Sequence, residues 1–240
     1  MKAFFSYYGS KFRGAKHYPS PRYDVVVEPF AGSAGYSCQI AYRRQVFLIE
    51  KNPAIVGIWK YLQSASRNEI MSLPDLNEDQ SVDDLSVCQE AKWLIGYWVN
   101  KGCAVPAKTA SKWMKDNRYA DQFWGKHKRQ MIANQLHCIK HWTIIEGDYT
   151  SAPNIEATWF IDPPYIKKGY SYTHNKINYD ELGQWCKSRQ GQVIVCEQKG
   201  ADWLPFVEFK SFKSNHKTAT SEEVIFIQDK KCPSQIQLFK

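Results

Sequence analysis

The chain has 240 residues, 43% of them hydrophobic, a size that fits one α/β domain with a sizeable core and an insertion. Its formal net charge of +8 at pH 7 favours a polyanionic partner such as nucleic acid. No run approaches the ~18 consecutive apolar residues of a membrane span, and the N-terminus lacks the apolar core of a signal peptide. The composition therefore argues against a membrane protein and favours a cytoplasmic location.

The seven cysteines are spread along the chain without any Cys-x-x-Cys pair. Their odd number and apolar flanks indicate reduced cysteines of a cytoplasmic protein without a disulfide framework. His137, Cys138 and His141 resemble metal ligands, but no second pair with matching spacing accompanies them. We therefore expect neither disulfides nor a metal ion.

The N-terminal quarter alternates between strand and helix signals. Apolar runs at 25–28 and 46–50 predict two strands. A turn with small residues and a helical stretch to about Arg44 separate them, and a second helical stretch starts near Pro53, a residue type suited to a first helical turn. This strand–helix–strand–helix order predicts a parallel sheet.

The middle of the chain changes character, because strand signals fade and aromatic, lysine-rich helical patterns replace them. Helices are expected at 89–100, 110–114 and 118–138. We interpret residues 61–142 as an inserted helical domain.

Strand signals resume after this segment, and they complete the predicted sheet. The runs lie at 143–145, 158–161, 192–196, 207–212, 224–228 and 235–239. The fold class predicted is α/β, with a Rossmann-like, mostly parallel sheet and one antiparallel edge strand. Residues 1–60 and 143–240 would form this sheet domain around the helical insertion.

Positive charge is concentrated in the predicted insertion. Residues 101–142 hold nine Lys or Arg against two acids. A solvated helix face usually mixes signs, so this segregation favours a surface that faces phosphates. The candidate phosphate contacts are Lys101, Lys112, Lys115, Arg118, Lys128 and Arg129.

The most informative segment is Asp162-Pro163-Pro164-Tyr165, which directly follows the apolar run 157–161. It therefore lies where a parallel strand ends, the position at which open α/β sheets bind ligands. Asp162 and the Pro163 carbonyl could accept the two hydrogens of an exocyclic amine, and the Tyr165 ring could stack on a planar base. The alternative is an ordinary proline turn after a strand.

A second candidate site is the turn at 28–35, Glu-Pro-Phe-Ala-Gly-Ser-Ala-Gly, between the first strand and the following helix. Its small residues allow a cofactor to approach the backbone. Glu50 ends the next strand, about 20 residues on, where nucleoside-binding α/β folds hold a ribose diol. The alternative for Glu50 is a solvated acid at a strand end.

Two further segments carry polar and aromatic side chains near predicted strand ends. Asp148 and Tyr149 follow the third strand, where they could contact an adenine or form an ordinary turn. Tyr7 and Lys11 precede the first strand, and Lys11 could pair with a ligand carboxylate. As isolated features, Tyr7 and Lys11 would more often be a core tyrosine and a surface lysine.

Together these segments resemble the Dam-type DNA adenine-N6 methyltransferases, the alpha-ordered class of DNA amino-methyltransferases. The order of motifs carries the resemblance: Tyr-x-Gly-Ser-Lys at 7–11, Glu-Pro-Phe-Ala-Gly-Ser at 28–33, an acid after the second strand, Gly-Asp-Tyr at 147–149 and Asp-Pro-Pro-Tyr at 162–165. It covers nearly the whole chain outside about 61–142. Asp-Pro-Pro-Tyr in this context is its specific element, whereas the glycine loop is not.

The resemblance implies a pocket for S-adenosylmethionine and no metal. Tyr7 and Lys11 would lie near the methionine moiety, Glu50 would hold the ribose, and Asp148 with Tyr149 would contact the adenine. The residues implied to bind the cofactor are Tyr7, Lys11, Glu28, Phe30, Ala31, Gly32, Glu50, Asp148, Tyr149 and Asp162.

The resemblance also implies a reaction and a partner. Asp162, Pro163, Pro164 and Tyr165 would hold an adenine extruded from double-stranded DNA, and its N6 amino group would receive the methyl group. The aromatic loop at 170–173 would help to clamp this base. No obligate protein partner is implied, and inserted residues 61–142 would bind the DNA.

Two departures and two alternatives accompany the resemblance. Ala34 stands where the family's loop usually has a second glycine, and the insertion lacks the pattern of enzymes that read GATC, so no target sequence is predicted. Methylation of cytosine N4 would use the same geometry. A catalytically inactive DNA-binding relative is the alternative outside enzymes. Carbon-5 methylation of cytosine is disfavoured, because the Cys232-Pro233 pair has the reverse order of the loop it requires.

Overall fold

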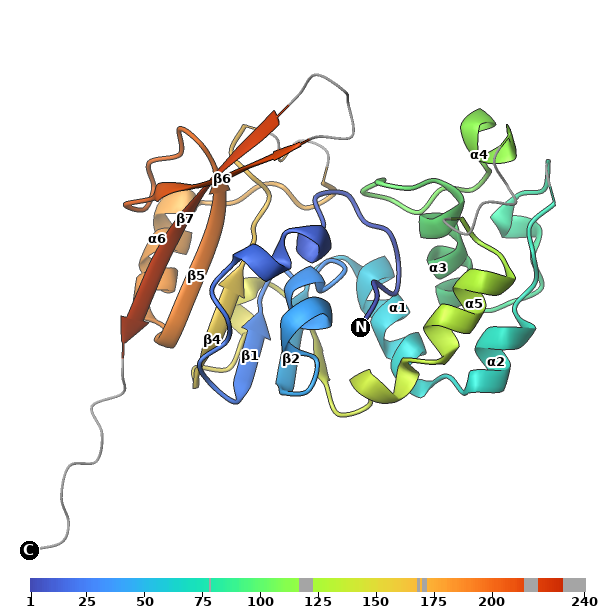
Figure 1. Ribbon diagram of the computed structural model, residues 1–240, viewed down its shortest axis with the longest axis horizontal. Helices are drawn as coiled ribbons and strands as arrows, with labels where there is room; N and C mark the ends of the chain where they lie inside the picture. The colour runs from blue at the N-terminus through green and yellow to red at the C-terminus, as the bar shows by residue number, and fades with distance from the viewer. Residues whose placement is uncertain (78, 117–122, 168, 170–171, 214–219, 231–240) are drawn as a thin grey trace, which may run out of the picture.

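Seven strands form one sheet in the order β3-β2-β1-β4-β5-β7-β6 (Figure 1). The computed structural model describes residues 1–77, 79–116, 123–167, 169, 172–213 and 220–230. The strands are β1 (Val25–Glu28), β2 (Gln45–Glu50), β3 (Thr143–Glu146), β4 (Glu156–Ile161), β5 (Gln190–Gln198), β6 (Val207–Lys213) and β7 (Thr220–Lys230). The two strands nearest the middle of the sheet, β1 and β4, pair in parallel.

Antiparallel pairing is confined to one side of the sheet. β1 to β5 pair in parallel with one another, whereas β7 is antiparallel to both β5 and the outermost strand β6. This confirms the predicted α/β sheet, mostly parallel with antiparallel pairing at one edge. The strand predicted at 235–239 lies outside the described residues.

Each face of the sheet carries its own apolar core, because side chains alternate along every strand. In β1, Val26 belongs to one core and Val27 to the other. Helix α1 (Pro53–Ser64) contributes to the first core, and helix α6 (Tyr179–Ser188) covers the second. The central strands are therefore buried on both faces, as the continuous apolar runs of the sequence predict.

The described part of 61–142 consists of helices and connecting segments without a strand. Its helices gather at the end of the molecule beyond α1 (Figure 1). They are α2 (Arg67–Ser72), α3 (Gln89–Val99), α4 (Lys112–Asp116) and α5 (Lys126–Ala133). The helix expected at 118–138 falls partly outside the described residues, and its remainder is α5 and a 3₁₀ turn. Among all described residues, no helix is long and apolar enough to cross a membrane.

Several connections contain short helical turns. The helical stretch expected up to Arg44 is largely a π-helical turn at Ser37–Ala41. The 3₁₀ turns are Lys11–Arg13, Ala15–His17, Val82–Asp84, Leu136–Ile139 and Tyr149–Ser151.

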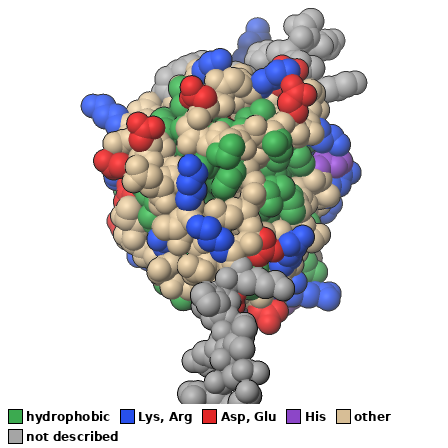
Figure 2. Space-filling view, turned by 90° about the vertical axis from the view of Figure 1, so that its left-hand side faces the viewer, with side chains coloured by type: hydrophobic (Ala, Val, Ile, Leu, Met, Phe, Trp, Pro, Cys, Tyr) green, Lys and Arg blue, Asp and Glu red, His purple; other side chains and the backbone are tan. Residues whose placement is uncertain are grey.

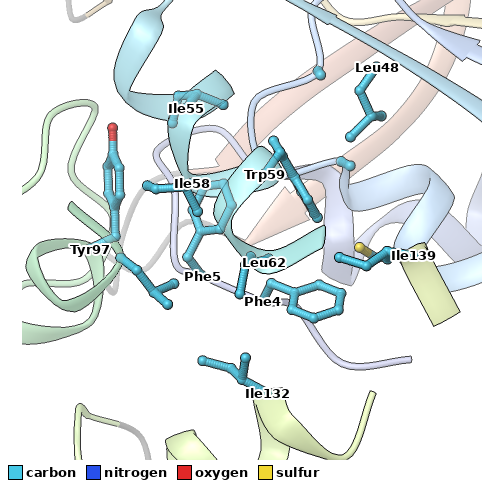
Figure 3. Packing of buried hydrophobic residues seen from close by; sticks show 14 of the residues in the cluster. Phe4, Phe5, Leu48, Ile55, Ile58, Trp59, Leu62, Tyr97, Ile132 and Ile139 are labelled. Carbon is cyan, nitrogen blue, oxygen red and sulfur yellow. The ribbon is translucent and has the colours of Figure 1, made fainter. Parts of the chain in front are cut away.

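The helices of the predicted insertion share one core with a face of the sheet (Figure 3). Phe5 packs 5.4 Å from Trp59 of α1 and 5.5 Å from Tyr97 of α3, measured between ring centroids. The Trp98 indole donates a hydrogen bond of 2.9 Å to the Phe4 carbonyl. The domain boundary predicted after residue 60 lies inside α1. A recognition role for these helices remains a prediction.

We expect Phe5→Ala to lower the free energy of unfolding by about 3–5 kcal/mol, because it empties a fully buried site between α1 and α3. Far-UV circular dichroism and tryptophan fluorescence should report the same urea midpoint, since Phe5 contacts both α1 and α3, a helix of the predicted insertion. Val105→Ala is the matched control, because Val105 is 56% exposed and should change stability by about 0.5 kcal/mol or less. Separate transitions for the two probes would contradict a shared core.

Candidate active site

A cavity of about 650 Å³ opens at the carboxyl ends of β1, β2, β3 and β4. The chain reaches its wall directly after each strand, at residues 28–33, 50–52, 147–150 and 162. β1 and β4 lie side by side, and from them the sheet extends outward in opposite directions. Open α/β sheets bind ligands at such a switch point.

All ten residues predicted to bind a cofactor line this one cavity. They come from the N-terminal segment and from the four strand ends, and they are Tyr7, Lys11, Glu28, Phe30, Ala31, Gly32, Glu50, Asp148, Tyr149 and Asp162. The structure thus brings together segments that are up to 155 positions apart (7 to 162) in the sequence.

The Glu50 carboxylate organises the turns around two strand ends. One oxygen accepts the backbone N–H of Gly32 at 2.9 Å, and the other accepts those of Lys51 and Asn52 at 2.9 Å each. Burial raises the pKa of Glu50, and these hydrogen bonds oppose the increase. A carboxylate accepts about four hydrogen bonds, so the oxygen facing Gly32 keeps acceptor capacity for a ligand in the cavity.

The loop after β1 adopts a conformation that favours glycine. Gly32 has φ of +46°, and Ala34 has φ of +47°. Ala34 is therefore an alanine in the left-handed region, which costs an L-residue about 1–2 kcal/mol. At Gly35, an added Cβ would lie 2.5 Å from the Phe12 nitrogen, so only glycine lets the turn that carries Lys11 approach this closely.

Glu28 is a buried carboxyl group at the end of β1. One of its oxygens accepts the Ser37 N–H at 2.8 Å. Burial raises the pKa of Glu28 to about 7, although the hydrogen bond from Ser37 opposes the increase. The wall of the cavity therefore holds a carboxyl group that titrates near neutral pH.

Lys11 connects the N-terminal segment to two strands of the sheet. Its ammonium lies 3.0 Å from Asp162 Oδ1, 3.5 Å from Glu223 Oε1 and 4.6 Å from the centroid of the Tyr165 ring. These carboxylates raise the pKa of Lys11, whereas its burial lowers it. In this structure, the polar partners of the Lys11 ammonium are two acids of the chain itself.

Asp162 is the acid most affected by this arrangement. Burial raises the pKa of its carboxyl to about 6, with Glu223 adding to the increase and Lys11 opposing it. Above about pH 6 the group is an acceptor-only carboxylate, able to bind an amine.

The prolines of the same segment differ in their contacts. The Pro164 carbonyl accepts a hydrogen bond from the Tyr179 hydroxyl at the start of α6. None of the hydrogen bonds between described residues ends on the Pro163 carbonyl, the predicted acceptor for an amine. The Tyr165 ring faces Lys11 and does not line the cavity itself.

Aromatic rings form one wall of the cavity. Phe30 and Tyr149 stack with centroids 5.5 Å apart, and Trp185 of α6 meets the edge of Tyr149 at 5.1 Å. Beside them, Asp148 forms an ion pair of 3.2 Å with Lys51. This wall offers an apolar surface to a planar ligand next to polar groups.

Tyr7 belongs to an aromatic group that links the cavity to the core. Its ring lies 5.6 Å from Tyr97 and 6.1 Å from Tyr172, and it contacts the backbone around Gly32. Tyr7 is therefore a packing residue that also lines the cavity, and its contact with a cofactor stays a prediction.

Two features of the site were not predicted from the sequence. Glu223 on β7 is buried beside Lys11, and its other oxygen accepts the Tyr18 hydroxyl. Residues 174–178 and Glu181 also line the cavity. Residues 170 and 171 of the predicted clamp loop lie outside the described residues. The only signal for Glu223 was an acid at the start of a predicted strand, and such acids are common.

The residues predicted to contact phosphates differ in exposure. Lys112 on α4 is exposed, whereas Lys115 forms an ion pair of 2.6 Å with Asp79. Lys101 is partly buried, 5.5 Å from the Phe123 ring centroid. Arg118 lies outside the described residues.

Lys128 and Arg129 are buried, at 9% and 8% exposure. Lys128 lies 4.6 Å from the Trp98 ring centroid, and Arg129 forms an ion pair with Asp75. In this conformation both side chains are buried against neighbours of the chain, and their contact with phosphates stays a prediction. The opposite end of the molecule, at α6 and β7, shows basic and acidic side chains intermixed around apolar patches (Figure 2).

No group of three or more His, Cys, Asp or Glu side chains within the described residues has the geometry to hold a metal ion.

Comparison of the chain with protein-family models and with curated proteins found no match. Among solved structures, it is similar to a conserved hypothetical protein from Streptococcus pyogenes. The two share 13% identity over 89% of each chain with a TM-score of 0.37, a likeness too distant to carry an argument.

We expect Glu28 to make stability depend on pH. Its pKa is raised in the folded state, so the folded protein binds the proton more tightly, and stability falls as pH rises from about 4.5 through about 7. Relative to wild type, Glu28→Gln should gain about 2–3 kcal/mol between pH 5 and pH 8 in urea unfolding. Glu146→Gln, at the exposed end of β3, is the control and should show no such gain. Equal pH dependence in the two variants would contradict this assignment.

Proposed function

We propose that this protein is a DNA methyltransferase that transfers a methyl group from S-adenosylmethionine to the N6 amino group of an adenine extruded from duplex DNA. The observation that carries the proposal is the convergence of all ten predicted cofactor residues on one cavity, with Asp162 of the Asp-Pro-Pro-Tyr segment in its wall. The family resemblance of the sequence supplies the identity of the reaction.

The cavity fits a nucleoside cofactor by size and by chemistry. Its volume of about 650 Å³ lies within the usual range of about 300–1,000 Å³ for small-molecule sites. Glu50 would accept the ribose hydroxyls, and the stacked pair of Phe30 and Tyr149 would lie against the adenine. Tyr7 and Lys11 would lie near the amino-acid part. When bound, S-adenosylmethionine supplies an electrophilic methyl group on a sulfonium.

The chain's own residues would bind and orient the target base. Stacking on Tyr165 would offset part of the lost base stacking, about 1–3 kcal/mol per base. Asp162 and the Pro163 carbonyl would accept the two amino hydrogens and direct the nitrogen lone pair toward the methyl group. The Asp162 carboxylate would also stabilise the positive charge that develops on this nitrogen. Because its pKa is about 6, this role requires a pH above that value.

The decisive experiment is single-molecule sequencing of plasmid DNA from a methylation-free host that expresses the chain. We expect N6-methyladenine at one short motif, and its absence with Asp162→Ala. Asp162→Asn should reduce turnover by about 100-fold or more, because it removes the charge that balances the developing cation. Asp180→Asn, an exposed acid on α6, is the matched control and should retain activity.

Other outcomes of this experiment point to the alternatives. N4-methylcytosine would change the target base but keep the same site. An expressed, folded protein without any modified base, and without binding of S-adenosylmethionine by calorimetry, would leave the catalytically inactive DNA-binding relative. Near-wild-type turnover of Asp162→Asn would refute the role of this carboxylate.

DNA binding should weaken steeply with salt, because contacts with phosphates release counterions. Lys112 is the exposed lysine among the predicted contacts, and Lys112→Ala should lower the slope of log affinity against log salt by about one. Lys187 is an exposed residue of α6, at the other end of the molecule (Figure 1). Lys187→Ala should leave the slope unchanged. Fluorescence anisotropy with a labelled duplex from 50 to 300 mM salt measures both variants. A slope unaffected by Lys112→Ala would count against this surface.

A further inference from the structure

The Lys11 ammonium occupies the position that the proposed function assigns to the amino group of the target base. It lies 3.0 Å from Asp162 Oδ1 and over the ring of Tyr165, 4.6 Å from its centroid. A base that stacks on Tyr165 and donates to Asp162 would need the same space. Lys11 therefore has to leave this position before a base can enter.

Glu223 is the second acid within reach of the ammonium. Its Oε1 lies 3.5 Å from Lys11 Nζ, on the side of β7, and Asp162 and Glu223 are the ion-pair partners of Lys11 among the described residues. The other oxygen of Glu223 accepts the Tyr18 hydroxyl, which fixes the orientation of the carboxylate. The strand itself is held, because β7 pairs along its length with β5 and with β6.

We propose, on the premise of the function proposed above, that Glu223 is a positioning residue that receives the Lys11 ammonium when the target base takes its place on Asp162 and Tyr165. Only hydrogen bonds and ion pairs change in this step, and Lys11 keeps its proton. The ammonium moves less than the length of its own side chain, since both acids already contact it.

Electrostatics require such a receiving group. A buried ammonium without a carboxylate partner is strongly destabilising, so Lys11 cannot simply leave Asp162. If it stayed, it would neutralise the charge on Asp162 that should stabilise the developing cation, and it would repel a sulfonium in the same cavity. Two other buried acids lie nearby, and neither forms an ion pair with Lys11 among the described residues. Glu28 already accepts the Ser37 N–H, and Glu197 already accepts the Gln198 N–H and the Trp203 indole N–H.

The test compares Glu223→Gln with Glu222→Gln. Glu222 is the adjacent acid of β7, is 53% exposed and pairs with Lys199 rather than Lys11, so it controls for the same substitution on the same strand. Three quantities are measured for each: methyl transfer from tritiated S-adenosylmethionine to plasmid DNA, binding of S-adenosylhomocysteine by calorimetry, and the thermal midpoint.

We expect Glu223→Gln to lower kcat/KM for DNA by about tenfold or more, because Lys11 then stays on Asp162. Its affinity for S-adenosylhomocysteine should stay within about threefold of wild type, and Glu222→Gln should match wild type throughout. A loss of kcat/KM in a folded variant that merely follows a loss of S-adenosylhomocysteine binding would overturn the proposal in favour of a structural role. Equal activity of the two variants would also overturn it.

A double variant keeps the proposal testable if Glu223→Gln folds poorly. Lys11→Gln with Glu223→Gln removes the ammonium and one of its two carboxylates together, so the net charge of the group is unchanged and no ammonium occupies Asp162. With 2-aminopurine at the methylated position, extrusion of the base raises its fluorescence. This rise should be lost in Glu223→Gln and regained in the double variant. If the double variant does not regain the fluorescence, the proposed move of the Lys11 ammonium from Asp162 to Glu223 is overturned. Absence of methylation by the wild type would instead refute the proposed function, and this inference with it.

Discussion

The parallel order of β3, β2, β1 and β4 is the constraint from which the cavity follows. Parallel strands bring all their carboxyl ends to one edge, so each strand delivers its next residues to the same place. Glu28, Glu50, Asp148 and Asp162 meet there although they are distant in the sequence. Backbone N–H groups, Lys11 and Lys51 then partly balance the resulting acidic wall. The cavity is therefore a product of topology first and of side-chain chemistry second.

This constraint also explains how much the sequence could predict. A residue directly after a recognisable strand has a predictable location, which is why the eight cavity residues at strand ends could be located in advance. Tyr7 and Lys11 precede the first strand, and only the family resemblance placed them at the same site. Glu223 has no such signal, because only the reversal of β7 between β5 and β6 brings it to Lys11. The exposure of Lys128 and Arg129 likewise depends on Trp98 and on an acid about 50 positions away, and local composition carries no information about either.

Formal charge and effective charge therefore differ in this molecule. The net charge of +8 suggests a broadly basic surface, but Lys11, Lys128 and Arg129 place their charges in the interior against carboxylates or aromatic rings. Long basic side chains pack their apolar stems well, so they contribute to a core as well as to a surface. The cations that a polyanion would meet form a smaller set than the sequence count indicates.

The pairing of β1 with β4 has a consequence for how the chain acquires its structure during synthesis. Val26 pairs with Thr158, so β1 waits for a neighbour that the ribosome delivers 132 residues later (158 − 26). Until then one side of an apolar central strand has no partner, and such unpaired edges promote intermolecular association. Contacts of this range also slow folding. The order of synthesis therefore leaves one side of β1 without its native partner until β4 has been made.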